Sequence, residues 1–255
     1  MPLSVFSNVI GRKRSTFAPK GDACTLATSF SLPLLAWVNI PAGQVRLEGH
    51  ASTFEIPAFK IAKYPVTNQQ FAAFIHDGGY TDQRWWQDLA QAVKTPRESD
   101  WPEGDHPKLE VCWYEAMAFC RWLADKTEHS VRLPTEWEWQ WAAVGDSAWD
   151  YPFGARFDAT KCNTKEASVR RTNAVVEYEG VPTYFSPVDM AGNVWEWCLN
   201  EGEIPEHIQH GESANRALRG GSWNNGSQHA RAAFRYHRTP QTRTLNIGFR
   251  LMMAM

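Results

Sequence analysis

Residues 219–251 read RGGSWNNGSQHARAAFRYHRTPQTRTLNIGFRL and combine two kinds of residue. One kind forms blocks of structural residues (GGSW, RAA and NIGFR), and the other is a scatter of Asn, Gln, His, Phe, Tyr, Thr and Leu between them. The pair Gly220 and Gly221 permits close approach of the backbone, and Gly248 permits a bend into a last strand. The blocks therefore predict a scaffold, and the scatter predicts side chains with another purpose.

Arginines recur among the apolar residues of this segment. Buried or looped backbone needs partners for its carbonyl groups, and the forked guanidinium suits both carbonyls and carboxylates. We therefore expect a structural role, with carboxylates such as Glu136, Glu138 or Glu196 as partners. The arginines concerned are Arg219, Arg231, Arg235, Arg243 and Arg250.

The segments upstream contain recognisable helices and strands. Short strands punctuated by Pro and Gly are predicted from Trp37 onward. Thr67 is a predicted helix N-cap with Gln70 at the capping-box position, and Thr135 and Glu138 repeat that pattern. Between these two caps, WYEAMAFCRWLADK has the three- and four-residue apolar spacing of an amphipathic helix.

Loops without a sustained period follow Trp149, which favours an α+β fold in one domain. Loops of this length are uncommon in compact domains and usually serve function. Residues 1–35 show no clean period, so we expect an N-terminal extension over 1–35 and a folded domain over 36–255.

Composition excludes several classes of protein. A net charge of −2 gives no sign of a nucleic-acid or membrane partner, and no run approaches the ~18 apolar residues of a membrane span. The five cysteines are scattered without a CxxC pair, which predicts buried thiols. The 13 tryptophans predict buried indoles with satisfied N–H donors. We expect a cytoplasmic monomer.

Five phrases, in order, resemble the formylglycine-generating enzyme (sulfatase-modifying factor) family. They are KYPVTNQQFAAFI, HPKLEVCWYEAMAFCRWLA, VRLPTEWEWQWAA, DMAGNVWEWC and the LRGGSW…RAAFR…NIGFRL series. The resemblance implies a variant of the C-type lectin fold with two helices, a short twisted sheet and many ordered loops.

The resemblance also bears on catalysis. Oxidases of the family bind copper(I) with two cysteines in the last segment, and these positions are Asn225 and Ala230 here. Neither residue provides the soft thiolate that copper(I) requires, so we expect no catalytic residue, no catalytic cofactor and no enzyme activity. The iron-dependent sulfoxide synthases of the family add a helical domain with a histidine triad, which this sequence does not show. Two alternatives stay open: an oxidoreductase of copper or iron type with a relocated active site, and a non-catalytic scaffold that docks to a kinase or a secreted enzyme.

A third branch resembles this sequence more closely: the variable proteins of diversity-generating retroelements. Their last segment, here about 219–251, keeps a frame of GGSW, ARAA-x-R, TP-x-x-R and IGFRL, while adenine-rich codons in the gaps are diversified. The resemblance implies a ligand-binding protein whose variable side chains contact an unknown protein or other macromolecule. The gap residues are Asn225, Gly226, His229, Phe234, Tyr236, His237, Arg238, Thr242, Thr244, Leu245 and Asn246.

Side chains that vary must point away from the core, or each variant would unfold. We expect aromatic anchors at Phe234, Tyr236 and His237, with adaptable polar contacts at Asn225, Thr242 and Thr244. The alternative is that an apolar gap residue such as Phe234 or Leu245 belongs to the core.

The phrase DMAGNVWEW resembles a calcium-binding stretch of the family. The resemblance implies a structural calcium held by the side chains of Asp189 and Glu196 and by the carbonyls of Gly192 and Val194, and oxygen donors of this kind suit Ca²⁺. The alternative makes Asp189 a turn residue and Glu196 the partner of an arginine.

Overall fold

The computed structural model describes residues 35–208 and 214–255, so the predicted extension lies outside the described residues except at its last position. The strands are β1 (Trp37–Ile40), β2 (Gly43–Arg46), β3 (Thr53–Ile56), β4 (Phe59–Ala62), β5 (Val131–Arg132), β6 (Trp195–Glu201), β7 (Arg216–Arg219), β8 (Tyr236–Arg238), β9 (Ile247–Phe249) and β10 (Met252–Ala254). The α-helices are α1 (Asn68–His76), α2 (Trp113–Thr127) and α3 (Glu136–Val144), with short 3-10 turns at Gln83–Trp86, Lys165–Ala167 and Ser227–Ala230.

Both predicted capping boxes are present. The Thr67 hydroxyl accepts from the Gln70 N–H at 3.2 Å, and the Thr67 N–H donates to the Gln70 side chain at 3.0 Å. Thr135 and Glu138 form the same reciprocal pair at the start of α3. Each box satisfies donors that the first helical turn leaves open.

Three α-helices occur in the described part of the chain, one more than the two expected. The third, α3, begins after the Thr135 cap that was predicted from the sequence, and it is buried on nearly every side. Its buried residues include Glu136, Glu138 and Gln140, so it lacks the polar–apolar period from which helices are identified, and the cap is its main sequence signal.

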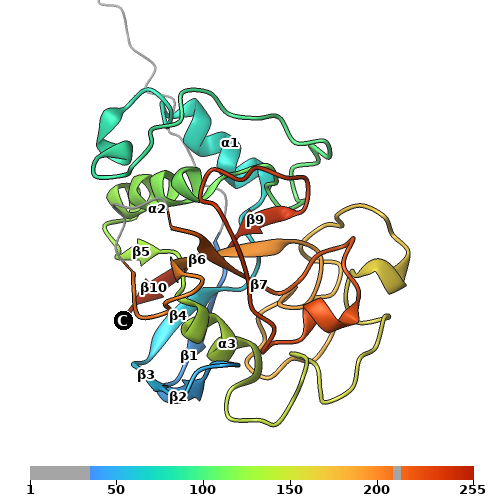
Figure 1. The fold of residues 1–255 in the computed structure, drawn as a ribbon. Coiled ribbons are helices and arrows are strands. Elements are labelled where there is room, and N and C mark those ends of the chain that lie inside the picture. Colours follow the sequence, from blue (N-terminus) through green and yellow to red (C-terminus); the bar gives the residue numbers. More distant parts are fainter. Residues whose placement is uncertain (1–34, 209–213) are drawn as a thin grey trace, which may run out of the picture. The chain divides into compact units, whose positions relative to one another are not determined.

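The C-terminal segment takes part in both larger sheets of the described residues (Figure 1). One sheet has the order β1-β4-β10-β5 and the other β8-β7-β6-β9, with β2-β3 as a separate hairpin. In the second sheet β9 runs parallel to β6, while β7 is antiparallel to both β6 and β8. Residues 219–251 contribute to the second sheet through the end of β7, β8 and β9 and lead directly into β10 of the first, so their frame determines where the gap residues lie.

Aromatic packing dominates the core. Phe71, Phe74, Phe119, Trp122 and Phe249 form a cluster of ring contacts with centroids 5.3–6.2 Å apart. Most buried indoles donate their N–H as predicted, to carbonyl or carboxylate oxygens; examples are Trp86, Trp113, Trp139, Trp141 and Trp197. Trp85 is an exception, because its buried N–H has no hydrogen-bond partner among the described residues.

One buried ion pair links the two larger sheets. Arg250 follows β9 and forms a bidentate pair with Glu196 of β6, with N–O distances of 2.8 and 2.9 Å. Its remaining N–H groups donate to the carbonyls of Ala62, Lys63 and Val188. Both charged side chains are fully buried, so this predicted arginine–carboxylate pair is confirmed as part of the scaffold.

Among the described residues, no helix has the length and apolar character needed to cross a membrane.

Candidate ligand-binding surface

One face of the β8-β7-β6-β9 sheet passes from the core to the surface. Alternate residues of a strand face the same side, and the register aligns Tyr236 with Leu218 and Leu218 with Trp197. Arg238, two residues after Tyr236 on β8, and Trp195, two residues before Trp197 on β6, therefore lie on this same face. Leu218 and Trp197 are fully buried, whereas Arg238 is exposed.

A cavity of about 240 Å³ lies where this face reaches the surface. Its aromatic wall is a stack in which the Tyr236 ring lies 5.1 Å from Trp195 and the Arg238 guanidinium lies 4.4 Å from the Tyr236 ring. The cavity is lined by Trp195, Asn224, Asn225, His229, Tyr236, Arg238, Thr244, Asn246 and Ile247.

The opposite wall is a network of short polar side chains. Asn225 accepts from the Trp195 indole N–H at 2.8 Å and from the Ser222 hydroxyl. Asn246 donates to Asn224 at 3.0 Å and accepts from the Thr244 hydroxyl at 2.8 Å. These bonds orient the amide groups that line the cavity.

Residues 239–246 are attached to the start of α2. The guanidinium of Arg243 binds both oxygens of Glu115, at 2.6 and 2.7 Å, and Tyr80 donates to the same carboxylate. The backbone N–H of Trp113 donates to the Pro240 carbonyl at 3.0 Å. Arg243 therefore fulfils the predicted structural role, although its partner Glu115 was not among the expected carboxylates.

Residues 231–235 are attached to α3 in a similar way. Glu136 is fully buried and accepts from Arg219 at 3.1 Å and from Arg235 at 2.6 and 2.7 Å. Arg219 also donates to the carbonyl of Ala232. Arg231 makes a longer contact of 3.4 Å with the exposed Glu48. Glu138, which was also expected to pair with an arginine of this segment, pairs with Arg132 instead.

The gap residues all keep accessible surface. Arg238, Thr244 and Leu245 are exposed and the other eight are partly buried. Leu245 therefore has no core role, whereas Phe234 and Tyr236 pack against the hydrophobic core while keeping some accessible surface. Whether these side chains bind a ligand stays a prediction.

The cavity brings together six of the eleven gap residues. They are Asn225, His229, Tyr236, Arg238, Thr244 and Asn246. Phe234 does not line the cavity, but its ring contacts that of His229, with the two ring centroids 4.9 Å apart. Gly226, Thr242 and Leu245 do not line the cavity.

His237 does not line the cavity, although it follows Tyr236 directly on β8. Its ring lies 6.5 Å from the Tyr236 ring and nearly parallel to it. Its Cβ lies against Gly202, where a Cβ added to that glycine would come within 2.3 Å. His237 is therefore an aromatic neighbour of Tyr236 outside the cavity.

Three lining residues were missed from the sequence: Trp195, Asn224 and Ile247. Trp195 directly precedes Glu196, which is buried with Arg250. Because neighbouring strand residues point to opposite faces, Trp195 must lie on the face of β6 opposite to Glu196. Alternation within NVWEW was the signal that could have identified it.

The positions that correspond to the family's two cysteines have different surroundings. Asn225 is partly buried at the cavity, whereas Ala230 is fully buried beside Tyr151, Cys162 and Ala191. The described cysteines, at 112, 120, 162 and 198, are buried free thiols. Burial raises the pKa of Cys162 to about 12, so this thiol is protonated at neutral pH.

The predicted calcium ligands divide into two groups. Both Glu196 oxygens are bound by Arg250, and one also accepts from the Trp139 indole at 2.6 Å. Glu196 is therefore the partner of an arginine, as the alternative to calcium binding predicted. Asp189 is buried and accepts from Asn193 at 2.8 Å through one oxygen, while no described residue donates a hydrogen bond to the other. Burial raises the pKa of Asp189 to about 7. The unpaired oxygen of Asp189 fits a cation, while the carboxylate of Glu196 is already engaged.

Asp189 has φ of 59° and Gly192 has φ of 81°, so both adopt left-handed backbone in this turn. No cluster of three or more His, Cys, Asp or Glu side chains suited to a metal occurs within residues 35–208 and 214–255, so a calcium ion here depends on Asp189 and backbone carbonyls.

Calcium is expected to stabilise the protein through Asp189. At a hundredfold excess over Kd a bound ion adds about 2.7 kcal/mol, which corresponds to a Tm increase of roughly 5–10 °C in a domain of this size. Differential scanning calorimetry in CaCl₂ and in EDTA measures this shift. Asp189→Asn should abolish it, whereas Asp158→Asn, at a partly exposed carboxylate, should not. Equal Tm values in CaCl₂ and EDTA would exclude the calcium site.

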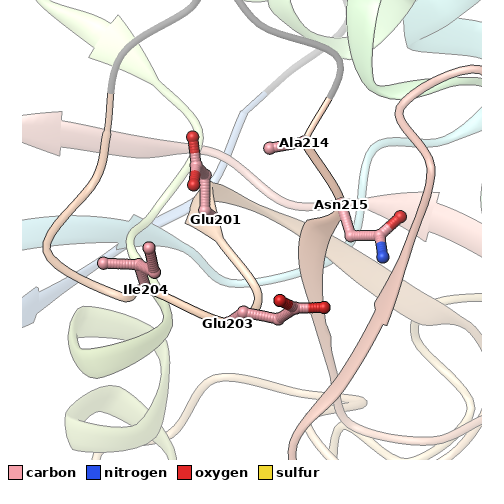
Figure 2. A pocket seen from close by; sticks show the side chains of 5 residues that line it. All are labelled: Glu201, Glu203, Ile204, Ala214 and Asn215. Atoms are coloured by element: carbon pink, nitrogen blue, oxygen red, sulfur yellow. The ribbon is translucent and has the colours of Figure 1, made fainter.

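A second cavity, of about 290 Å³, lies next to the end of β6 (Figure 2). It is lined by Glu201, Glu203, Ile204, Ala214 and Asn215. None of its lining residues is a gap residue, and it borders a stretch outside the described residues.

Comparisons with known proteins agree with this architecture. The family described as the sulfatase-modifying factor enzyme 1-like domain matches residues 26–255. The hercynine oxygenase of Mycolicibacterium thermoresistibile is 30% identical over 269 residues, which cover 91% of this chain and 59% of the oxygenase. The inactive C-alpha-formylglycine-generating enzyme 2 of Mus musculus is 26% identical over 272 residues, which cover 84% of each protein.

Among solved structures, Treponema denticola variable protein 1 superposes with a TM-score of 0.68 at 21% identity, covering 87% of this chain and 95% of that one. The expected α+β, C-type lectin-like fold is thereby confirmed. The chain spans a little over half the length of the hercynine oxygenases that it matches.

Proposed function

This chain belongs to the family of sulfatase-modifying factor enzyme 1-like domains, and within that family we propose that it is a non-catalytic, ligand-binding variable protein of a diversity-generating retroelement. Its ligand is a protein or another macromolecule, and the contact surface is the cavity of Tyr236 and Arg238 with its rim. The protein acts in the cytoplasm as a monomer, without a nucleic-acid or membrane partner.

The division of burial within residues 219–251 carries this proposal. Frame residues such as Arg219, Ala230, Ala232, Ile247 and Arg250 are buried, while every gap residue keeps accessible surface. Diversification is tolerated only where a changed side chain does not disturb packing. The burial of these frame residues supports the proposal, and the other frame residues Arg231, Arg235 and Arg243, which keep some accessible surface, are held by carboxylates.

The fold can support this role. Treponema denticola variable protein 1 shares it, and the gap residues of this chain lie on loops and a strand fixed by buried ion pairs. A backbone held by Glu115 and Glu136 can display different side chains without rearrangement.

An oxidoreductase is the second candidate, because the hercynine oxygenase is 30% identical to this chain. Against it, Asn225 and Ala230 occupy the positions of the family's copper-binding cysteines, and the nearby Cys162 is a buried, protonated thiol. We expect no oxygen consumption above background with copper(I) or iron(II) and a thiol substrate, measured with an oxygen electrode. Metal-dependent consumption would favour the oxidoreductase.

The neighbouring DNA tests the proposal directly. We expect a near-copy of the codons for residues 219–251, with adenine-rich Asn codons at the gap positions, next to a reverse transcriptase gene. A locus that lacks such a copy, or whose copy differs at frame codons as often as at gap codons, would contradict the proposal.

A further inference from the structure

We propose that the cavity beside Tyr236 binds an acidic side chain of the protein ligand, an inference that rests on the proposed function. The first argument is charge. Arg238 is an exposed cation at the cavity, and the lining contains no Asp or Glu. Within the described residues no carboxylate forms an ion pair with Arg238, whereas the frame cations Arg219, Arg235, Arg243 and Arg250 all have carboxylate partners.

The second argument is preorganisation. Arg238 lies over Tyr236 at 4.4 Å, and Tyr236 lies on the buried Trp195. Stacking holds the guanidinium flat while its N–H edges stay available, which is the arrangement that binds a carboxylate with two parallel hydrogen bonds. Less side-chain freedom is then lost on binding.

The third argument is size and polarity. A cavity of about 240 Å³ is smaller than the roughly 300–1,000 Å³ of most small-molecule sites, and it suits a single side chain. The lining also carries the amides of Asn224, Asn225 and Asn246, whose N–H groups can donate to a carboxylate oxygen.

The rim favours a protein as the source of the carboxylate. Leu245 is 38% exposed, and the partly buried Trp223 donates its indole N–H to the Leu245 carbonyl at 3.1 Å. Trp223 also packs edge-on against Trp101 at 5.2 Å. Trp and Arg are enriched in the energetic centres of protein interfaces, so an acidic residue flanked by apolar ones fits this surface.

Selection from a phage-displayed library of disulfide-constrained random heptapeptides, on the full 255-residue chain, tests the inference. We expect selected peptides to be enriched in Asp or Glu, and a Glu→Gln change in a peptide to weaken binding about tenfold, as loss of a charge-assisted pair implies. On Arg238→Ala the same peptide change should alter Kd less than twofold, and Arg238→Glu should select Lys or Arg. Arg156→Glu, an exposed residue outside the lining, is the matched control and should select acidic peptides.

The outcomes separate this inference from the proposed function. Neutral peptides that bind the chain and lose binding on Tyr236→Ala would overturn the acidic preference and leave the proposed function intact. Peptides that bind equally to Tyr236→Ala and Arg238→Glu, or the absence of any selected peptide, would overturn both. Because Arg238 is exposed, Tm should be unchanged in its variants, which separates lost binding from unfolding.

Discussion

Replacing Arg250 by methionine is expected to lower the free energy of unfolding by about 3–5 kcal/mol, the usual consequence of removing one partner of a buried ion pair. The change leaves the Glu196 carboxylate fully buried with only the Trp139 indole as a donor. It also removes the donors to three carbonyls that join the two larger sheets. Urea denaturation followed by tryptophan fluorescence measures the loss.

A matched exposed pair provides the control for Arg250. Arg84 and Asp82 are 2.7 Å apart, but the Arg84 side chain is 66% exposed, so Arg84→Met should leave the urea midpoint almost unchanged. Adding Glu196→Gln to Arg250→Met should recover part of the loss, because it removes the unpaired charge. Similar losses for Arg250→Met and Arg84→Met would show that the buried pair does not hold the sheets together.

Replacing Glu136 by alanine is expected to lower the free energy of unfolding by a similar amount, about 3–5 kcal/mol. Glu136 is the shared partner of Arg219 and Arg235, so its removal leaves one fully buried guanidinium and one partly buried guanidinium without a carboxylate. It also frees residues 231–235 beside the candidate surface. Denaturation midpoints and hydrogen exchange at residues 231–238 measure the two effects.

Glu48→Ala is the control for Glu136, because Glu48 also pairs with an arginine of the segment but is half exposed. We expect its effect on stability to be less than about 1 kcal/mol. If hydrogen exchange at residues 231–238 were unchanged in Glu136→Ala, the proposed attachment of this segment to α3 would be wrong.

The scaffold could be predicted from the sequence wherever a local rule applies. The capping boxes at Thr67 and Thr135 depend on residues three positions apart. The arginines were predictable as a class because a buried guanidinium needs acceptors. Their partners depend on tertiary placement: Glu115 looks like a first-turn residue of α2, and only the folded chain brings it to Arg243.

The candidate surface was predictable in composition but not in geometry. The frame identified which residues vary, and their exposure agrees with the structure. Which gap residues line the cavity depends on β8, a three-residue strand that the sequence does not mark. Trp195 was missed because it belongs to a distant segment, and the pairing of β6 with β9 brings it to the cavity.

Tolerance to substitution tests the central claim most directly. One display library randomises the eleven gap residues, and a matched library randomises the frame residues Gly220, Gly221, Ser222, Ala230, Arg231, Ala232, Ala233, Arg235, Arg243, Ile247 and Gly248. The fraction of variants that resist protease on the display surface reports folding. We expect most gap variants to stay folded and few frame variants to do so; equal fractions in the two libraries would contradict the account.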